Sequence, residues 1–226
     1  MTSGNSVMAA QPDQRDRGGS IPTLPLQLSM FEQPYIDVRD KPVKSFRVKE
    51  IEYGICKPFC IRWHYSKSCP VGQAYFGLYS GLYLIGIACF GPPAMKNQKD
   101  CYSCDMELRR LCCIDNTPKN TESYFISKTL ILLRKIGIRK VLSLADPNYG
   151  HNGGIYKASN FTLLGEERGG GSRDIFIDGE KIHSRTAFAR YGASGQKKLS
   201  EILHEKTVVV KEKKRKLVYI YNLAEE

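Results

Sequence analysis

The 226-residue sequence lacks any apolar run long enough to cross a bilayer. Its first 20 residues also lack the apolar stretch that a secretory signal carries between a basic end and a cleavage site. We therefore expect a cytoplasmic protein without a membrane partner. Its eight cysteines are then expected to be reduced thiols, because disulfides are rare in that compartment.

Acidic residues are scarce relative to basic ones, with 23 Asp and Glu against 34 Lys and Arg. The resulting formal charge of +11 indicates a polyanionic partner. Nucleic acid is the first candidate, and a membrane surface or an acidic protein is the alternative. Apolar residues make up 42% of the chain, which is typical of a globular protein.

Residues 1–40 are rich in Gly, Ser, Pro, Gln and Asp, which predicts a flexible tail. Residues 41–226 are expected to form a single domain that ends in basic strands. Apolar alternation predicts strands at 46–51, 74–79, 83–90, 106–114, 141–145, 161–164 and 174–177. Residues 206–221 are expected to contain two more strands, one on each side of a charged turn at 212–214.

Helical spacing predicts a helix over 122–136 and a short one over 154–159, and 55–66 is a helix or a turn region. A strand, helix, strand step indicates parallel pairing, whereas the hairpin around Ser80 and Gly81 indicates antiparallel pairing. Together they predict an α/β fold with a mixed, mostly antiparallel sheet and helices on both faces.

The loop that follows the strand at 141–145 is dense in reactive side chains. Asp146, Tyr149, His151 and Tyr156 fall within eleven positions, at the strand end where open sheets bind ligands. We expect them to share one cleft with His64. For any one of these residues alone, a polar surface loop is the competing interpretation.

Two further segments carry candidate site residues. Trp63-His64-Tyr65-Ser66 holds a His-Tyr pair that is suited to flanking a base, with His64 as a general base. Arg109 and Arg110 should face opposite sides of their strand, one toward the site and one toward phosphate. A core or surface histidine is the alternative for His64.

The cysteines leave two interpretations open. Cys101 and Cys104 have the spacing of half a zinc site, and Cys56, Cys60 and Cys69 are candidates for the other half. The spacing is irregular, and Cys112 and Cys113 lie in an apolar strand pattern, so free thiols are the favoured interpretation.

Long motifs in this region resemble known families. Gly154-x-Tyr156-x-x-x-Asn160-Phe161-x-x-x-Gly165 resembles the GCN5-related N-acetyltransferase superfamily, in which the tyrosine protonates the leaving thiol. Three motifs are similar to those of the Mom proteins of Mu-like phages over roughly residues 45–195: Glu107-Leu-Arg-Arg-Leu, Pro118-Lys-Asn-Thr-Glu-Ser-Tyr-Phe-Ile-Ser-Lys and Ala145-Asp-Pro-x-x-Gly-His-x-Gly-x-Ile-Tyr-x-Ala-Ser-Asn-Phe.

The resemblance implies an acyltransferase-like enzyme that converts adenine in double-stranded DNA to N6-carbamoylmethyladenine. The modification would shield phage DNA from restriction in the cytoplasm of the host bacterium. An iron requirement is also implied, for which His64, Asp146 and His151 are the candidate ligands. The expected catalytic residues are His64, Asp146, Tyr149 and Tyr156, and the expected substrate or donor contacts are Tyr65, Ser66, Arg109, Arg110, Ser123, His151 and Asn160.

The sequence departs from the superfamily at the loop that should bind acyl-coenzyme A. Residues 116–123 contain no glycine, so the tight backbone cradle for a pyrophosphate is missing, although Ser123 remains suited to an anion or polar group. Coenzyme A is therefore doubtful as donor, and a glycyl donor such as glycyl-tRNA is the hypothesis. That makes tRNA a second expected partner.

Basic residues concentrate toward the end of the chain, with eleven Lys or Arg and five Asp or Glu in 181–226. We expect the DNA contacts to come from Arg173, Arg185, Arg190, Lys213, Lys214 and Arg215. The alternatives are a non-catalytic, zinc-containing DNA-binding protein and a conventional coenzyme A-dependent N-acetyltransferase. A homodimer is also considered.

Overall fold

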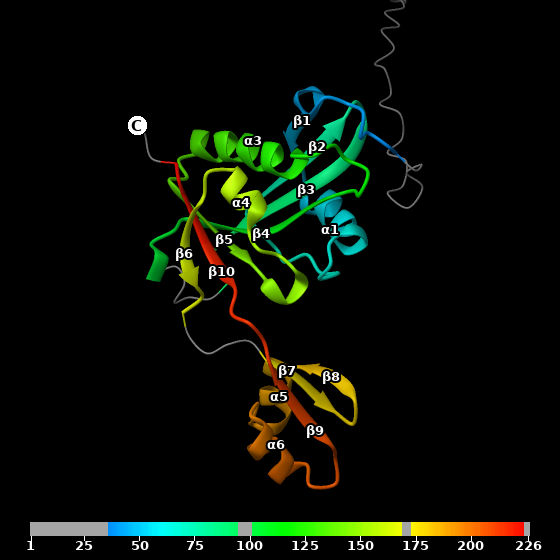
Figure 1. Ribbon diagram of the computed structural model, residues 1–226, viewed down its shortest axis with the longest axis vertical. Coiled ribbons are helices and arrows are strands. Elements are labelled where there is room, and N and C mark those ends of the chain that lie inside the picture. Colours follow the sequence, from blue (N-terminus) through cyan, green and yellow to red (C-terminus); the bar gives the residue numbers. More distant parts are fainter. Residues whose placement is uncertain (1–35, 95–100, 169–172, 224–226) are drawn as a thin grey trace, which may run out of the picture. The chain divides into compact units, whose positions relative to one another are not determined.

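The computed structural model describes residues 36–94, 101–168 and 173–223 (Figure 1). Its larger sheet has the strand order β1-β2-β3-β4-β5-β10-β6. The strands are β1 (Arg47–Glu50), β2 (Ala74–Ser80), β3 (Tyr83–Gly91), β4 (Met106–Cys113), β5 (Lys140–Ala145), β10 (Leu217–Asn222) and β6 (Thr162–Glu166).

Only the β4–β5 pair of this sheet is parallel. Helix α3 (Thr121–Lys135) makes the connection, as a parallel pair requires. The parallel ladder is short, running from Met106 opposite Val141 to Leu108 opposite Ser143. The mixed, mostly antiparallel sheet predicted from the sequence is confirmed.

Helices cover both faces of the larger sheet. Neighbouring residues of a strand point to opposite faces, and Cys112 lies against Cys60 of α1 (Tyr53–Trp63) whereas Cys113 lies near Glu122 of α3. Helix α3 buries one apolar stripe, made by Phe125, Ile126, Leu130 and Leu133. Asn120 occupies its N-cap position in a left-handed conformation, and its side chain makes no cap hydrogen bond.

A three-stranded module is inserted between β6 and β10, which are otherwise paired as an antiparallel hairpin with Leu217 opposite Glu166. This inserted module (residues 173–212) has the strand order β8-β7-β9 and its own apolar core. It comprises β7 (Arg173–Ile177), β8 (Glu180–His183), α5 (Ser184–Tyr191), α6 (Gln196–Ile202) and β9 (Val208–Glu212).

The module corrects one sequence-based expectation. The two strands predicted within 206–221 exist, but the charged turn expected at 212–214 overlaps the end of β9, and residues 213–216 join β9 to β10. Strand β9 pairs with β7, whereas β10 pairs with β5 and β6. Alternation of apolar residues predicts a strand but does not select its partner.

The folded chain begins earlier than the predicted tail boundary at residue 40. Val38 is buried, and its backbone N–H donates to the Asn116 carbonyl at 3.0 Å. Residues 1–35 of the predicted tail lie outside the described residues. None of the helices in the described part of the chain is long and apolar enough to span a membrane.

Candidate active site

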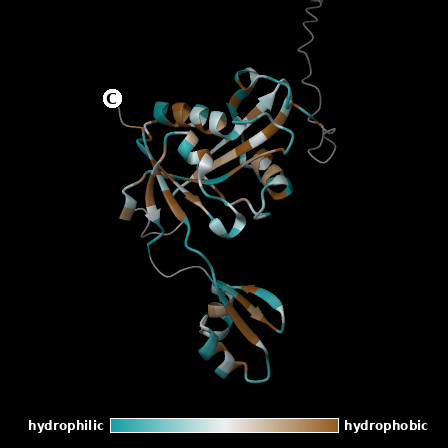
Figure 2. Ribbon diagram, in the orientation of Figure 1, coloured by the Kyte–Doolittle hydropathy of each residue, from teal (hydrophilic) through white to brown (hydrophobic). Residues whose placement is uncertain are grey.

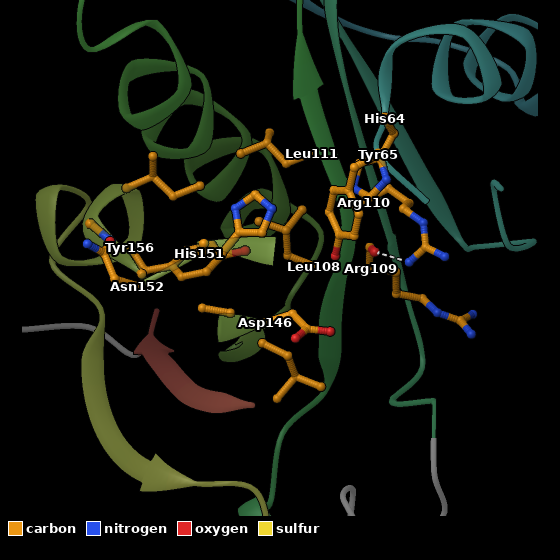
Figure 3. A pocket seen from close by; sticks show the side chains of 16 residues that line it. His64, Tyr65, Leu108, Arg109, Arg110, Leu111, Asp146, His151, Asn152 and Tyr156 are labelled. Atoms are coloured by element: carbon orange, nitrogen blue, oxygen red, sulfur yellow. Dashed lines mark hydrogen bonds between the residues drawn. The ribbon is translucent and has the colours of Figure 1, made fainter. Parts of the chain in front are cut away.

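A cavity of about 400 Å³ lies at the carboxyl end of β5, where the loop after it faces β4 and the end of α1 (Figure 3). Seven of the predicted site residues line it: His64, Tyr65, Arg109, Arg110, Asp146, His151 and Tyr156. The expected convergence of the post-β5 loop with His64 is therefore present in the structure.

Asp146 is held in place by the loop that it begins. Its Oδ1 accepts the backbone N–H and the side-chain amide of Asn148, at 3.0 and 2.7 Å, and caps the short helix η2 (Pro147–Tyr149). Oδ2 accepts no hydrogen bond within the described part of the chain. Asp146 thus offers the cavity one free carboxylate oxygen from a fixed, buried position.

Tyr219 of β10 fixes the start of helix α4 (Gly154–Ala158), a role that we did not expect from the sequence. Its hydroxyl donates to the Asn152 carbonyl at 3.0 Å, and its ring occupies the space that a side chain at residue 153 would need. Gly153 also has a φ of +76°, which favours glycine. No local pattern reveals this contact, because Tyr219 is 67 residues from Asn152.

Tyr156 of α4 is buried between the rings of Tyr219 and Phe161, whose centroids lie 5.2 and 5.6 Å from its own. Burial raises the pKa of Tyr156 to about 12, and the neighbouring Ser143 hydroxyl opposes the shift. That hydroxyl is buried and has no hydrogen-bond partner of ordinary geometry in the described chain. Tyr156 therefore keeps its proton at neutral pH and is suited to donating it.

His64 ends α1 and is buried, with its Nδ1 accepting the Ser66 backbone N–H at 3.1 Å. Because a backbone N–H only donates, the neutral ring carries its proton on Nε2. Burial lowers the pKa of His64 to about 4, with Arg110 and His151 contributing in the same direction. At neutral pH His64 is an uncharged donor whose Nδ1 already accepts a hydrogen bond, whereas Asp146 has a free acceptor oxygen.

Four rings form one wall at the cavity. The Tyr65 ring lies 4.3 Å from His64, 4.5 Å from Tyr149 and 4.9 Å from His151, centroid to centroid. Tyr65 and Tyr149 are 45% and 49% exposed. Tyr149 does not line the cavity itself but extends the stack outward. Exposed aromatic faces beside a cavity favour a planar, apolar ligand ring.

Arg109 and Arg110 line the same cavity, which corrects the expectation that they face opposite sides. The strand register shifts here, so that Cys89 pairs with Arg110 but Phe90 pairs with Leu108. Such a β-bulge breaks the alternation of side chains. The guanidinium groups bond to the Val71 and Ser68 carbonyls, and neither forms a salt bridge within the described residues, so their positive charge is available to an anionic ligand.

The remaining predicted site residues lie outside the cavity lining. Ser66 bonds to His64 Nδ1 from behind, Ser123 donates to the Asn120 carbonyl within α3, and Asn160 is exposed after α4. Among the predicted DNA contacts, Arg173 forms a salt bridge with Glu212 at 3.4 Å. Four others are exposed: Arg185, Arg190, Lys214 and Arg215.

The side chains do not fit the metal sites expected from the sequence. Among the described residues, no three His, Cys, Asp or Glu side chains are arranged to hold a metal ion. His64 Nδ1 accepts a hydrogen bond, whereas a ligating histidine donates from its second nitrogen. Of the proposed zinc pair, Cys101 is exposed and Cys104 is buried, and the eight cysteines form no disulfide among the described residues.

The sequence matches the model of the Mom protein family over residues 45–226. This chain belongs to the Mom family. It is 32% identical over 164 residues to a protein of Escherichia phage Mu named methylcarbamoylase mom. The match covers 67% of this chain and 66%, just under two thirds, of that protein. The family resemblance read from the sequence motifs is confirmed.

Similar solved structures are acetyltransferases. One is an N-acetyltransferase from Staphylococcus aureus, 13% identical, with a TM-score of 0.45 over 79% of this chain and 97% of that one. Another is a putative acetyltransferase from Salmonella typhimurium, 9% identical, with a TM-score of 0.47 over 80% and 96%. The expected α/β fold class is confirmed by the strands and helices of this chain itself.

Proposed function

We propose that this Mom-family protein is a transferase that converts adenine in DNA to N6-carbamoylmethyladenine and so protects phage DNA from restriction in the host cytoplasm. The observation that carries the proposal is one cavity that is lined by Asp146, which has a free carboxylate oxygen, and by Tyr156 and His64, which each hold a proton. Family membership supplies the class of substrate.

The adenine would have to leave the base stack to reach this cavity, because its N6 lies within the duplex. The half-exposed rings of Tyr65 and Tyr149 supply a stacking surface for the extruded base. The uncompensated charges of Arg109 and Arg110 suit a phosphate or the developing oxyanion of a donor carbonyl. A purine is thereby held between an aromatic wall and a cationic strand.

Each of three cavity residues has a different role in moving or donating a proton. Asp146 takes the proton from N6 through its free oxygen, and Tyr156 gives a proton to the leaving group. His64 donates from Nε2 to the donor carbonyl. These roles follow from the free acceptor oxygen of Asp146 and from the protons that Tyr156 and His64 hold at neutral pH.

For the donor we propose an activated glycyl ester, such as glycyl-tRNA. Attack of N6 on the glycyl carbonyl forms an amide bond and breaks the ester C–O bond, and Tyr156 protonates the departing alkoxide to give the alcohol. The free glycyl amine then attacks C6 through a five-membered spiro intermediate. Cleavage of the bond from C6 to the original nitrogen leaves N6-carbamoylmethyladenine, with no net oxidation or reduction.

Mass spectrometry of nucleosides tests the function. DNA from cells that express the wild-type protein should contain the modified adenosine, and Tyr156→Phe should reduce its formation by about 10²- to 10⁴-fold. Loss of only the hydroxyl should leave the fold intact. Unmodified DNA from cells that contain folded wild-type protein contradicts the proposal.

Glycine labelled with 15N tests the donor separately. The label should appear on the nitrogen attached to C6, while the original exocyclic nitrogen becomes the terminal amide. Fragmentation of the nucleoside distinguishes the two positions. Label in the terminal amide, or no label, rules out the glycyl route but leaves the identity of the proposed product unaffected.

A further inference from the structure

The inserted module leaves one face of its sheet uncovered. Ile175 and Ile177 of β7 and Val208 of β9 point to α5 and α6 and form the module's core. Because side chains alternate, the intervening Phe176 and Val209 point the other way. Phe176 is partly buried and Val209 is 38% exposed, on the side of the sheet that faces away from α5 and α6. Figure 1 shows both helices on the same side of the strands.

Lysines surround the ring on this open face. The Lys211 ammonium lies 5.4 Å from the centroid of Phe176, and Lys181 is the cross-strand neighbour of Phe176 on β8. The one carboxylate there, Asp174, is shared by Lys181 at 3.0 Å and Lys213 at 3.6 Å. Three cations against one anion leave the face positive.

The module is joined to the chain at the mouth of the cavity. Leu217, the first residue of β10, pairs with Ala145, which lines the cavity. The Asn148 side chain donates to the Lys214 carbonyl and accepts from the Lys214 N–H, both at 2.9 Å. The Lys213 ammonium lies 5.2 Å from the Tyr149 ring centroid. The segment that carries the module is thus fastened to the site loop.

We propose that the open face of the inserted module binds an unpaired DNA strand beside the modified adenine. One base stacks on Phe176, and phosphates pair with Lys181 and Lys211. Aromatic rings bind bases regardless of sequence, and lysines track the backbone, so their combination fits a single strand. This inference rests on the proposed function, because extrusion of the target adenine leaves the base opposite it without a partner.

Phe176→Leu tests the stacking, since it retains apolar volume but removes the ring. By fluorescence anisotropy, the variant should bind a single-stranded DNA oligonucleotide about 5- to 100-fold more weakly than the wild type. An abasic oligonucleotide of the same length should bind equally to both proteins. Equal affinity for the normal oligonucleotide overturns the proposal, and so does an equal loss for both oligonucleotides.

Lys181→Ala/Lys211→Ala tests the charge, with Lys197→Ala/Lys198→Ala on α6 as the matched control. The first variant should flatten the dependence of log affinity on log salt by about 1.4, since each phosphate contact on a single strand contributes about 0.7. The control, whose lysines lie on the helix side, should retain the wild-type slope. Equal losses in the two variants overturn the assignment to this face.

Two outcomes separate this proposal from others. If an RNA oligonucleotide of the same sequence binds more tightly and only its affinity responds to Phe176→Leu, the occupant is RNA and the DNA assignment fails. If the wild type forms no modified nucleoside although the DNA results hold, the proposed function fails and the strand site stands.

Discussion

Buried polar side chains in the cavity differ in the proton that the fold lets them hold. His64 stays neutral because burial and Arg110 oppose its charge, and Tyr156 stays protonated because burial opposes the phenolate. Neither group therefore changes charge near neutral pH. Titration of His64 or Tyr156 should therefore not contribute to the pH dependence of catalysis between pH 6 and 8, which rates measured across that range would check.

His64 should make the protein less stable in mild acid. An unfolded histidine binds a proton near pH 6.5, whereas the pKa of folded His64 is about 4, so protons favour the unfolded state as pH falls below 6.5. We expect this group to lower the free energy of unfolding by about 2 kcal/mol between pH 7 and pH 5. Urea unfolding at both values measures it.

His64→Gln should remove most of that difference, because glutamine does not titrate. His204→Gln is the matched control, since the His204 side chain is 79% exposed, and it should behave as the wild type. A wild-type difference that persists in His64→Gln would contradict the assignment.

The elements around the cavity depend on contacts between distant segments. Helix α4 has only five residues, too few to be stable by itself, and Tyr219 of β10 supports its start. The position of Tyr156 is thereby set by a strand that lies 63 residues later in the chain. Tyr219 is a positioning residue that stabilises the loop through its ring and its hydroxyl.

Gly153→Ala and Gly150→Ala should separate backbone strain from this packing. Both glycines have positive φ, +76° and +77°, so both variants incur a strain of about 1–3 kcal/mol. Only at Gly153 would the new methyl overlap Tyr219, which adds about 1–3 kcal/mol of overpacking. Urea unfolding should show the larger loss of unfolding free energy for Gly153→Ala. Equal losses in the two variants would mean that the Tyr219 ring moves aside at no energetic cost.

Local patterns predicted most elements of the larger sheet but not their irregularities. Alternation and helical spacing located β2, β3, β4, α3 and β5 to within a residue or two, and the polar loop after β5 indicated the cavity. The bulge that turns Arg109 and Arg110 to one side depends on pairing with β3, which no run of β4 residues reveals. Helices α5 and α6 and strand β8 were not predicted at all.

Over the whole molecule, the excess of 11 positive charges should govern DNA affinity. Lys214 and Arg215 are exposed beside the site loop. Replacing both by alanine should weaken duplex binding and flatten the salt dependence by about 1.8, since each phosphate contact on a duplex contributes about 0.9. Anisotropy titrations over a range of salt concentrations measure the slope. If the affinity of the wild type for DNA did not depend on salt concentration, the claim that the positive charge governs DNA binding would be refuted.

Because the module is inserted into a hairpin, it can be treated as a unit separate from the larger sheet. Glu166 and Leu217 lie directly opposite each other, so the two points where the module leaves and rejoins the sheet are only about 5 Å apart. A segment with adjoining ends is readily removed or exchanged without disturbing the body that holds it. A short turn in place of residues 167–216 would close the hairpin but would remove the Lys214 contacts to Asn148. Modules transplanted between relatives at this joint would instead make chimaeras that share one active site but differ in their affinity for DNA.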